Sequence, residues 1–462
     1  MRTLLKKYIG DKQFYKMVLA VAVPIMIQNG ITNFVSLLDN IMVGQVGTTQ
    51  MSGVSIANNL IFVYNVSLFG AISGAGIFTA QFYGNGNTEG VRHTFRFKLI
   101  ICSILLAAAM LIFIFGGGSL ISLYLQGEGT AQEIADTFYY GRRYLNIMLI
   151  GLVPYTIVQA YSSTLRECGE TMMPMISGVV AVFVNLIFNY ILIFGNFGAP
   201  KLGVEGAAIA TVISRFVECG MIVLWTHTHT QKNPFIVAAY RSLCMPRKLA
   251  EEIIKKGSPL LANEVLWSIG MAILSQCYSY KGLDVVAGMN ISSTLYNVCN
   301  VAFMAMGNAV AIIIGQLLGA GKMEEAVDKD RKLIFFAVAI CFFFGAGMIL
   351  IAPLFPMLYN TTQTVRDIAK GLIIVEALYM PINSFIHSSY FTMRSGGKTV
   401  ITFLFDSVFV WVVTIPAAYI LSRYTGVPII PMYAICKGLD LIKCILGAVL
   451  LKKRVWVNNI VV

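Results

Sequence analysis

The sequence predicts an all-α protein that crosses a lipid bilayer twelve times and consists of two homologous six-helix bundles. Three observations predict this fold class. The 462 residues are 57% hydrophobic and only 12% charged, whereas soluble domains carry about 25% charged residues. Twelve apolar stretches are long enough for membrane helices, which need about 20 residues each. The second half of the chain also repeats the first.

The first six stretches are expected to form one bundle. The first contains Pro24, which removes a helical N–H and predicts a kink. The second is rich in glycine and ends at Gln81, and the fifth carries two asparagines four residues apart. In chain order the stretches cover residues 18–44, 53–80, 97–117, 140–161, 172–195 and 203–226.

The remaining six stretches are expected to form the second bundle. They cover residues 257–280, 286–316, 333–353, 368–391, 399–422 and 428–451. The predicted organisation is an N-terminal segment 1–17, an N-lobe 18–227, a linker 228–256, a C-lobe 257–451 and a tail 452–462.

The net charge of +12 is explained by topology. Of the 34 Lys and Arg residues, 24 lie in the N-terminus, the even-numbered connections and the tail. Cytoplasmic loops of membrane proteins collect such residues, so both termini are predicted to be cytoplasmic. The charge therefore does not indicate a nucleic-acid partner. The apolar surface of the protein is instead expected to contact the lipid bilayer.

An internal repeat supports the two bundles. A shift of 235 residues places Pro24 on Pro259 and Gln81-Phe-Tyr-Gly84 on Gln316-Leu-Leu-Gly319. A shift of 228 then places Arg166 on Arg394. Both halves begin on the same side of the membrane, so the repeats are parallel. Two such bundles can enclose a cleft that opens to either side, which favours a carrier over a channel, a receptor or a membrane enzyme.

Asp39 is the strongest candidate for a functional residue. A charge inside a membrane helix costs about 2.5–3.5 kcal/mol on insertion scales, and no Lys or Arg lies within one helical turn of Asp39 along the sequence. Such a carboxylate is expected to bind a proton or a cation. The alternative is a structural carboxylate hydrogen-bonded near the helix end.

Asn185 and Asn189 are the second candidate. Their spacing of four places both amides on one helix face. Amide oxygens are suitable ligands for Na⁺ and also accept hydrogen bonds from a protonated acid. Paired asparagines can equally serve to hold membrane helices together.

Together these features resemble the multidrug and toxic compound extrusion (MATE) transporters, over nearly the whole chain. The motifs that carry the resemblance are Pro24-x₁₄-Asp39, the glycine-rich helix ending Gln-x-x-Gly-x-Gly, Tyr144-Leu-Asn-Ile, Asn185-x₃-Asn189 and Gly203-Val-x-Gly-Ala-Ala-Ile-Ala-Thr211. The resemblance implies two lobes in a V shape, with a cation site in the N-lobe. The residues implied for that site are Asp39, Tyr144, Asn185, Asn189 and Thr211, with no metal beyond Na⁺ at Asp39, Asn185 and Asn189.

Two departures from the family pattern affect the implied sites. Asn189 stands where the archaeal and DinF-like branch of the family has Asp. This leaves the choice between H⁺ and Na⁺ as the coupling ion open. In the C-lobe, Trp267 stands where the NorM-like branch of the family has a Glu on the seventh helix. Glu264 lies three residues earlier on the same helix face. The tenth-helix Asp of that branch aligns with Asn383. Glu264, Trp267, Asn383 and Asn33 are therefore the expected substrate-cavity residues, although Glu264 is alternatively a cap near its helix start.

The remaining acids inside predicted helices have separate interpretations. Glu376 and Asp406 are weaker candidates for function. Two pairs at i,i+3 spacing are interpreted as local ion pairs that lower the cost of burial. These pairs are Arg215 with Glu218 and Lys437 with Asp440.

The resemblance implies a secondary-active antiporter that exports cationic amphipathic compounds in exchange for H⁺ or Na⁺. The 29 Phe, 21 Tyr and 22 Met are compatible with such substrates, because aromatic faces bind cations. We expect no enzyme activity, no cofactor, a monomer, and a bacterial cytoplasmic membrane. A flippase for lipid-linked saccharides is the alternative, but no cluster of intramembrane Arg is present. A membrane hydrolase would need a paired nucleophile and base, and we find no convincing set.

Overall fold

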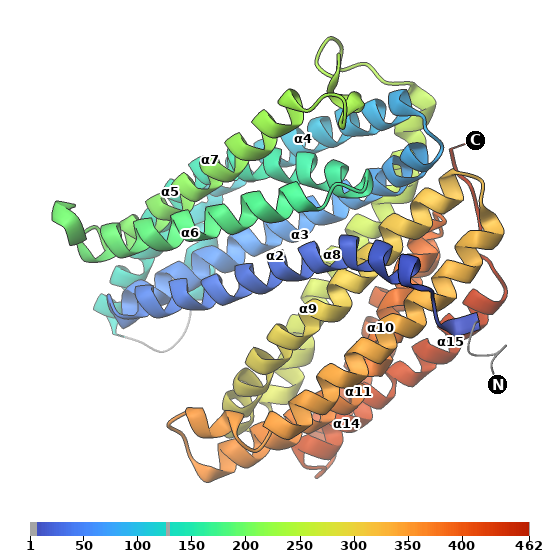
Figure 1. The fold of residues 1–462 in the computed structure, drawn as a ribbon. Coiled ribbons are helices and arrows are strands. Elements are labelled where there is room, and N and C mark those ends of the chain that lie inside the picture. Colours follow the sequence, from blue (N-terminus) through green and yellow to red (C-terminus); the bar gives the residue numbers. More distant parts are fainter. Residues whose placement is uncertain (1–6, 126–129, 462) are drawn as a thin grey trace. The chain divides into compact units, whose positions relative to one another are not determined.

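The computed structural model describes residues 7–125 and 130–461, except the side chains of residues 35–37, 40 and 41. The described residues form helices and connections without a strand (Figure 1). The long helices are α2 (Lys12–Gly44), α3 (Thr48–Gly84), α4 (Thr88–Tyr124), α5 (Ala131–Glu167), α6 (Met172–Phe194), α7 (Val204–Thr228), α8 (Arg247–Ser279), α9 (Leu283–Gly319), α10 (Met323–Ile351) and α11 (Gln363–Ser395).

The eleventh predicted helix is continuous but changes its winding. It begins as α12 (Thr399–Phe403), passes through the π-helical turns η4 (Leu404–Val408) and η5 (Val410–Thr414), and ends as α13 (Ile415–Tyr424). Such wide turns are rare and frequently occur at functional sites.

The twelfth predicted helix is broken. It consists of α14 (Ile429–Gly438) and α15 (Asp440–Lys452), which are separated at Leu439. Gly438 precedes the break, and glycine is a weak helix former. Eleven described segments are long and apolar enough to cross a membrane, and the broken pair occupies the twelfth position. The all-α, multi-pass membrane fold predicted from the sequence is therefore confirmed.

Two of these helices extend into segments that we expected to lie outside the lobes. Helix α2 begins at Lys12 and α8 at Arg247. The linker ahead of α8 is held to α4 by Arg96, which is buried and donates to the carbonyl oxygens of Ala238 and Ala239, both at 2.8 Å. Short 3₁₀ turns complete the connections at Asn196–Gly198, Pro234–Ile236 and Phe355–Leu358.

The chain divides into two compact units. Unit 1 comprises Met1–Met26, Ala80–Asn87 and Ile254–Val462. Unit 2 comprises Ile27–Thr79 and Thr88–Ile253. Helix α2 thus belongs to unit 1 at its start and to unit 2 from Ile27 onward, and the change comes three residues after Pro24.

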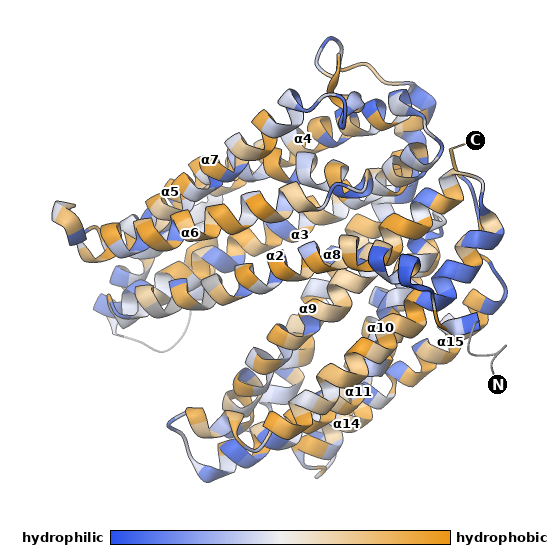
Figure 2. Cartoon of the chain, viewed as in Figure 1, coloured by the Kyte–Doolittle hydropathy of each residue, from blue (hydrophilic) through white to orange (hydrophobic). Residues whose placement is uncertain are grey.

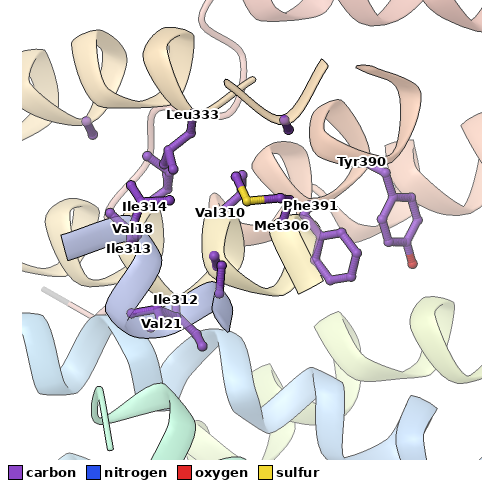
Figure 3. Close-up of a cluster of buried hydrophobic side chains, with 14 of the residues drawn as sticks. Val18, Val21, Met306, Val310, Ile312, Ile313, Ile314, Leu333, Tyr390 and Phe391 are labelled. Atoms are coloured by element: carbon purple, nitrogen blue, oxygen red, sulfur yellow. The ribbon is translucent and has the colours of Figure 1, made fainter. Parts of the chain in front are cut away.

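The core of unit 1 includes the first part of α2. Val18 and Val21 pack among Val310 and Ile313 of α9 and Leu333 of α10 (Figure 3). These side chains are at most 9% exposed. Burying each aliphatic side chain contributes about 1.5–3 kcal/mol, so the start of α2 is firmly attached to unit 1.

Unit 2 has its own core between α3, α4 and α5. Leu68, Phe113, Leu145 and Leu149 are buried there. Large apolar side chains also lie on the surface, including Phe115 at 82% exposure, and Figure 2 shows hydrophobic residues along most of the length of the helices. An apolar exterior over an apolar core is expected for helices that face lipid.

The repeated Gln-x-x-Gly motifs contact each other in unit 1. A Cβ atom at Gly84 would lie 1.9 Å from the carbonyl oxygen of Gln316, and one at Gly319 would lie 1.9 Å from that of Gln81. Only glycine permits this approach of α3 to α9. The contact is reciprocal, because each motif supplies the glycine that faces the other's glutamine.

Gln81 also fixes the end of the chain. Its side chain is fully buried; Nε2 donates to the Ser395 carbonyl oxygen at 2.8 Å, and Oε1 accepts from the Ile460 N–H at 2.8 Å. Trp456 is 1% exposed and belongs to the core of unit 1. Residues 455–461 are therefore an integral part of that unit.

Candidate cation site in unit 2

The residues expected to form the N-lobe site come from separate helices of unit 2. Asp39 lies on α2, Asn185 and Asn189 on α6, Thr211 on α7 and Tyr144 on α5. Helices α6 and α7 pack side by side. Both asparagines are buried, at 5% and 1% exposure, because the spacing of four places them on the inner face of α6.

Asn189 is the direct partner of Asp39. Its Nδ2 atom donates to Asp39 Oδ1 at 2.6 Å and to Asn185 Oδ1 at 3.1 Å. A hydrogen bond to a carboxylate is shorter and stronger than one between neutral groups. The predicted juxtaposition of these three side chains is therefore present.

The Asn185 amide has suitable contacts in either orientation. In one, Nδ2 donates to Thr211 Oγ1 at 3.2 Å. In the reversed orientation, Nδ2 lies 3.0 and 3.2 Å from the two carboxylate oxygens of Asp39, and Oδ1 accepts from Thr211 at 3.2 Å. An ionised Asp39 favours the reversed orientation, because a carboxylate accepts hydrogen bonds only.

Tyr144 lies near this group but directs its hydrogen bond elsewhere. Its hydroxyl donates to Asn58 Oδ1 at 3.3 Å, and the side chain is 5% exposed. Sequence reasoning did not identify Asn58, because its spacing does not distinguish it from Asn59 and Asn65 in the same glycine-rich helix.

Basic side chains in unit 2 are paired with groups other than Asp39. Arg215 lies 3.9 Å from Glu218, as its i,i+3 spacing predicts, and over the ring of Tyr155 at 4.2 Å. Lys98 forms an ion pair with Glu167. Among the described residues, no Lys or Arg forms an ion pair with Asp39.

The donor set suits a small cation. Asn189 Oδ1 is buried and has no hydrogen-bond partner among the described residues, and a buried oxygen left unsatisfied costs about 1–3 kcal/mol. The carboxylate of Asp39 and the amide oxygens of Asn185 and Asn189 are hard ligands of the kind that alkali cations prefer. The residues present therefore fit Na⁺, and the carboxylate alone fits H⁺.

The expected substrate-cavity residues are divided between the units. Glu264, Trp267 and Asn383 lie in unit 1, and Asn33 lies in unit 2. Trp267 is 38% exposed, and Glu264 lies within Coulombic range of Arg394 and Asp406. Their role in a cavity stays a prediction.

Two contacts in unit 1 differ from the sequence interpretation or were missed by it. Lys437 was expected to pair with Asp440, but its Nζ lies 3.1 Å from Glu376 Oε1. Asn263 donates to Asp406 Oδ2 at 3.2 Å. Asn263 is the repeat equivalent of Gln28 at the shift of 235, and Gln28 accepts from Arg166 at 2.7 Å in unit 2, so the repeat was the signal that could have identified it.

The sequence has relatives over most of its length. The Probable multidrug resistance protein NorM of Thermotoga maritima is 26% identical over 436 residues, which cover 91% of this chain and 89% of the relative. The Probable multidrug resistance protein YoeA of Bacillus subtilis is 26% identical over 427 residues, covering 89% and 88%.

Solved structures share the fold. An outward-facing multidrug resistance MATE family transporter of the MOP superfamily matches with a TM-score of 0.85 and 20% identity over 98% of this chain and 97% of that chain. A mutant of the Vibrio cholerae MATE transporter VcmN matches with a TM-score of 0.86 and 16% identity, covering 97% and 98%.

The family comparison also confirms the duplication. The model of the MatE family matches this chain twice, at residues 24–191 and 259–420. The two matches begin 235 residues apart and end 229 apart, in agreement with the internal repeat. The chain therefore belongs to the MatE family of membrane transporters.

Proposed function

We propose that this protein is a secondary-active antiporter of a bacterial cytoplasmic membrane, which exports cationic amphipathic compounds in exchange for H⁺ or Na⁺. The names of its relatives as multidrug resistance proteins support the substrate class. The single observation that carries the coupling is the Asp39 carboxylate, held by Asn189 at 2.6 Å without a described Lys or Arg as ion-pair partner.

Exchange follows from competition for one negative charge. A buried carboxylate is costly unless a positive charge neutralises it. The coupling cation supplies that charge, and a cationic substrate is attracted to the same carboxylate. Occupation by one therefore weakens the binding of the other, which couples the inward movement of the ion to the outward movement of the substrate.

The Asn185 amide adapts the site to both states. With its nitrogen toward Asp39, it stabilises the empty carboxylate; with its oxygen toward Asn189, it presents an additional ligand to a bound Na⁺. The reorientation breaks and forms hydrogen bonds only with neighbours already in contact, so release of the ion leaves no charged oxygen without a donor.

Export of drugs tests this proposal. We expect the wild-type protein to raise the tolerance of a bacterium lacking its main efflux pump to ethidium and fluoroquinolones, and Asp39→Asn to abolish this protection. Asn keeps the shape of the side chain but removes the negative charge. Asp136→Asn is the matched control, because Asp136 accepts from Gln132 within its own helix, outside the site.

Failure of the wild-type protein to protect against a broad panel would contradict multidrug export. Equal protection by wild type and Asp39→Asn would contradict the coupling role of Asp39. Proteoliposomes with an imposed Na⁺ gradient or pH gradient then identify the coupling ion.

A further inference from the structure

Gln28 lies at the start of the α2 segment that belongs to unit 2. It follows Pro24 by four residues and is the second residue of that segment, which begins at Ile27. The side chain is half-buried, and its Oε1 atom accepts a hydrogen bond from Arg166 of α5 at 2.7 Å. Because the donor is a guanidinium, this bond is stronger than one between neutral groups. Gln28 therefore attaches α2 to unit 2 close to the boundary between the units.

The Gln28 side chain also lies against α6. A Cβ atom at Gly178 would be 2.8 Å from Gln28 Nε2 and 3.3 Å from its Cγ, so the amide fills the space that a larger residue at position 178 would need. Gly178 is buried on the same face of α6 as Asn185 and Asn189. Small residues allow membrane helices to approach closely at such contacts. Gln28 is thus held by α5 and α6 together.

The contacts of α2 with α6 at Gln28 and at Asp39 have the same register. Gln28 precedes Asp39 by eleven residues, and Gly178 precedes Asn189 by eleven as well, so the offset between the two helices is 150 at both points. Eleven residues make three helical turns, about 16 Å along the axis, and return to the same helix face. The Gly178 contact and the Asn189 hydrogen bond are therefore two points of one helix–helix interface.

The acids near Arg166 do not replace this hydrogen bond. Arg166 lies within Coulombic range of Glu218 and Glu167, but each of these acids already pairs with another basic side chain. The Arg166 Nε atom is buried and has no hydrogen-bond partner among the described residues. The guanidinium is therefore not saturated by the acids, and Gln28 is the acceptor that ties it to α2.

We propose that Gln28 is a positioning residue of the cation site, which sets the register of α2 on α6 and thereby holds Asp39 against Asn189. Gln28 does not contact the ion, since it lies about three helical turns from Asp39. It is also not among the residues that the family resemblance implied for that site. The role rests on the proposed ion coupling at Asp39, but its effect on cation binding is measured without any export assay.

Cation binding to purified full-length protein tests this role. One arm measures bound radioactive sodium at constant ionic strength with choline chloride, and the other measures proton uptake in an acid titration of weakly buffered protein. The difference between each protein and the same protein carrying Asp39→Asn isolates the site in unit 2.

Gln28→Ala removes the acceptor for Arg166 and the contact with α6. For a sodium site, we expect the concentration at half-saturation to rise about 10-fold, as it does when residues that orient metal ligands are lost. For a proton site, the equivalent shift is about one pH unit. We expect it toward higher pH, because a displaced Asn189 amide stabilises the ionised carboxylate less.

Two further variants identify the contact itself. Gln28→Glu keeps an acceptor for Arg166, so we expect cation binding close to that of wild type. Gly178→Ala displaces the Gln28 amide from the side of α6, so we expect a shift in the same direction as for Gln28→Ala. If Gln28→Ala does not fold, Gly178→Ala decides the question.

The chain offers two matched controls. At Gly220 in α7, an added Cβ would have no atom within 4 Å, so Gly220→Ala should bind the cation like wild type. Asn263 is the repeat equivalent of Gln28 and lies in unit 1. We expect Asn263→Ala to lower the melting temperature in detergent but to leave half-saturation of the Asp39 site unchanged, which separates positioning from a general loss of stability.

The inference is overturned if folded Gln28→Ala or Gly178→Ala binds the cation like wild type, if Gln28→Glu shifts binding as far as Gln28→Ala, or if a control shifts it equally. It is also overturned if Asp39→Asn removes no cation binding, since no site is then positioned. Failure of the antiporter proposal has a different signature. In that case Asp39→Asn exports drugs as well as wild type, whereas the two binding arms still decide the role of Gln28.

Discussion

The amide of Asn189 controls how easily Asp39 carries its charge. It donates the 2.6 Å hydrogen bond to the carboxylate and is 1% exposed, so water cannot replace it without rearrangement. A hydrogen bond to a charged group contributes about 1.5–3 kcal/mol. The ionised, cation-free state of Asp39 therefore depends on this residue more than the neutral state does.

Asn189→Leu should trap the neutral, proton-bound state. Loss of the donor makes release of the proton roughly 10- to 100-fold less favourable, from the same 1.5–3 kcal/mol. We expect the pH of half-maximal ethidium export in proteoliposomes to move upward and the protection against drugs to fall. Asn196→Leu is the control, since Asn196 follows α6 and its amide donates to the Tyr190 carbonyl oxygen, outside the site. An unchanged pH profile for Asn189→Leu would contradict this role.

Sequence alone predicted the central residues of this site but not their partners. Asn185 and Asn189 share a face because helical periodicity is local, and Asp39 stands out because it is charged in an apolar stretch. The Tyr144 contact with Asn58 and the Lys437 contact with Glu376 depend on which helices pack together. Glu376 precedes Lys437 by 61 residues, and a long lysine side chain reaches several possible acids.

Helix α2 connects the two units through the region of Pro24. Its first part packs in the core of unit 1, and the part from Ile27 onward, with Asp39, belongs to unit 2. Proline removes one N–H from the helix and disfavours the straight form by about 3 kcal/mol relative to alanine. A bend is therefore less costly here than elsewhere in α2.

Pro24→Ala should separate ion binding from transport. The straight form of α2 gains up to about 3 kcal/mol, so we expect drug protection to be largely lost while sodium or proton uptake at Asp39 is retained. Pro154→Ala is the matched control, because Pro154 lies inside α5, which stays within unit 2. Full protection by Pro24→Ala, or equal loss in Pro154→Ala, would show that the proline near the unit boundary has no special role.

The crossing of α3 and α9 should tolerate no side chain. Gly84→Ala or Gly319→Ala places a Cβ against a carbonyl oxygen, and overpacking costs about 1–3 kcal/mol. We expect each variant to melt at a lower temperature in detergent. The double variant should cost less than the sum, because separation of the helices relieves both clashes. Gly347→Ala in α10, where no atom lies within 4 Å, is the neutral control.

The twelve-helix architecture was predictable, but its irregularities were not. Apolar stretches of membrane length and the duplication define the number and order of the helices. The π-helical turns around Asp406 have no local signal, since Phe403 and Phe409 flank the first of them. Gly438 before the break at Leu439 is a weak signal, because glycines also occur inside the unbroken helix α9. Both irregularities lie next to ion-paired acids, because Lys443 contacts Asp440 after the break and Asp406 in η4.

Unit 1 is assembled from distant parts of the chain, and the last residues complete it. Deletion of residues 455–462 removes the buried Trp456 and the Ile460 N–H that Gln81 accepts from. We expect a lower melting temperature, because loss of a buried Trp side chain costs about 3–5 kcal/mol. Gln81→Leu should destabilise the full-length chain more than the truncated one, because in the truncated chain the amide oxygen has already lost the Ile460 N–H and only the Nε2 bond to the Ser395 carbonyl oxygen remains. An equal loss in both backgrounds would contradict this explanation.

The reciprocal contact between the Gln-x-x-Gly motifs has an evolutionary consequence. Each glycine meets the glutamine of the other repeat, which is the isologous pairing that a two-fold axis imposes on identical subunits. A half-length ancestor could therefore have formed this crossing as a homodimer, before gene fusion joined the two copies. After fusion, either copy was free to acquire its own charges, such as Asp39 in the first repeat and the Glu376–Lys437 pair in the second.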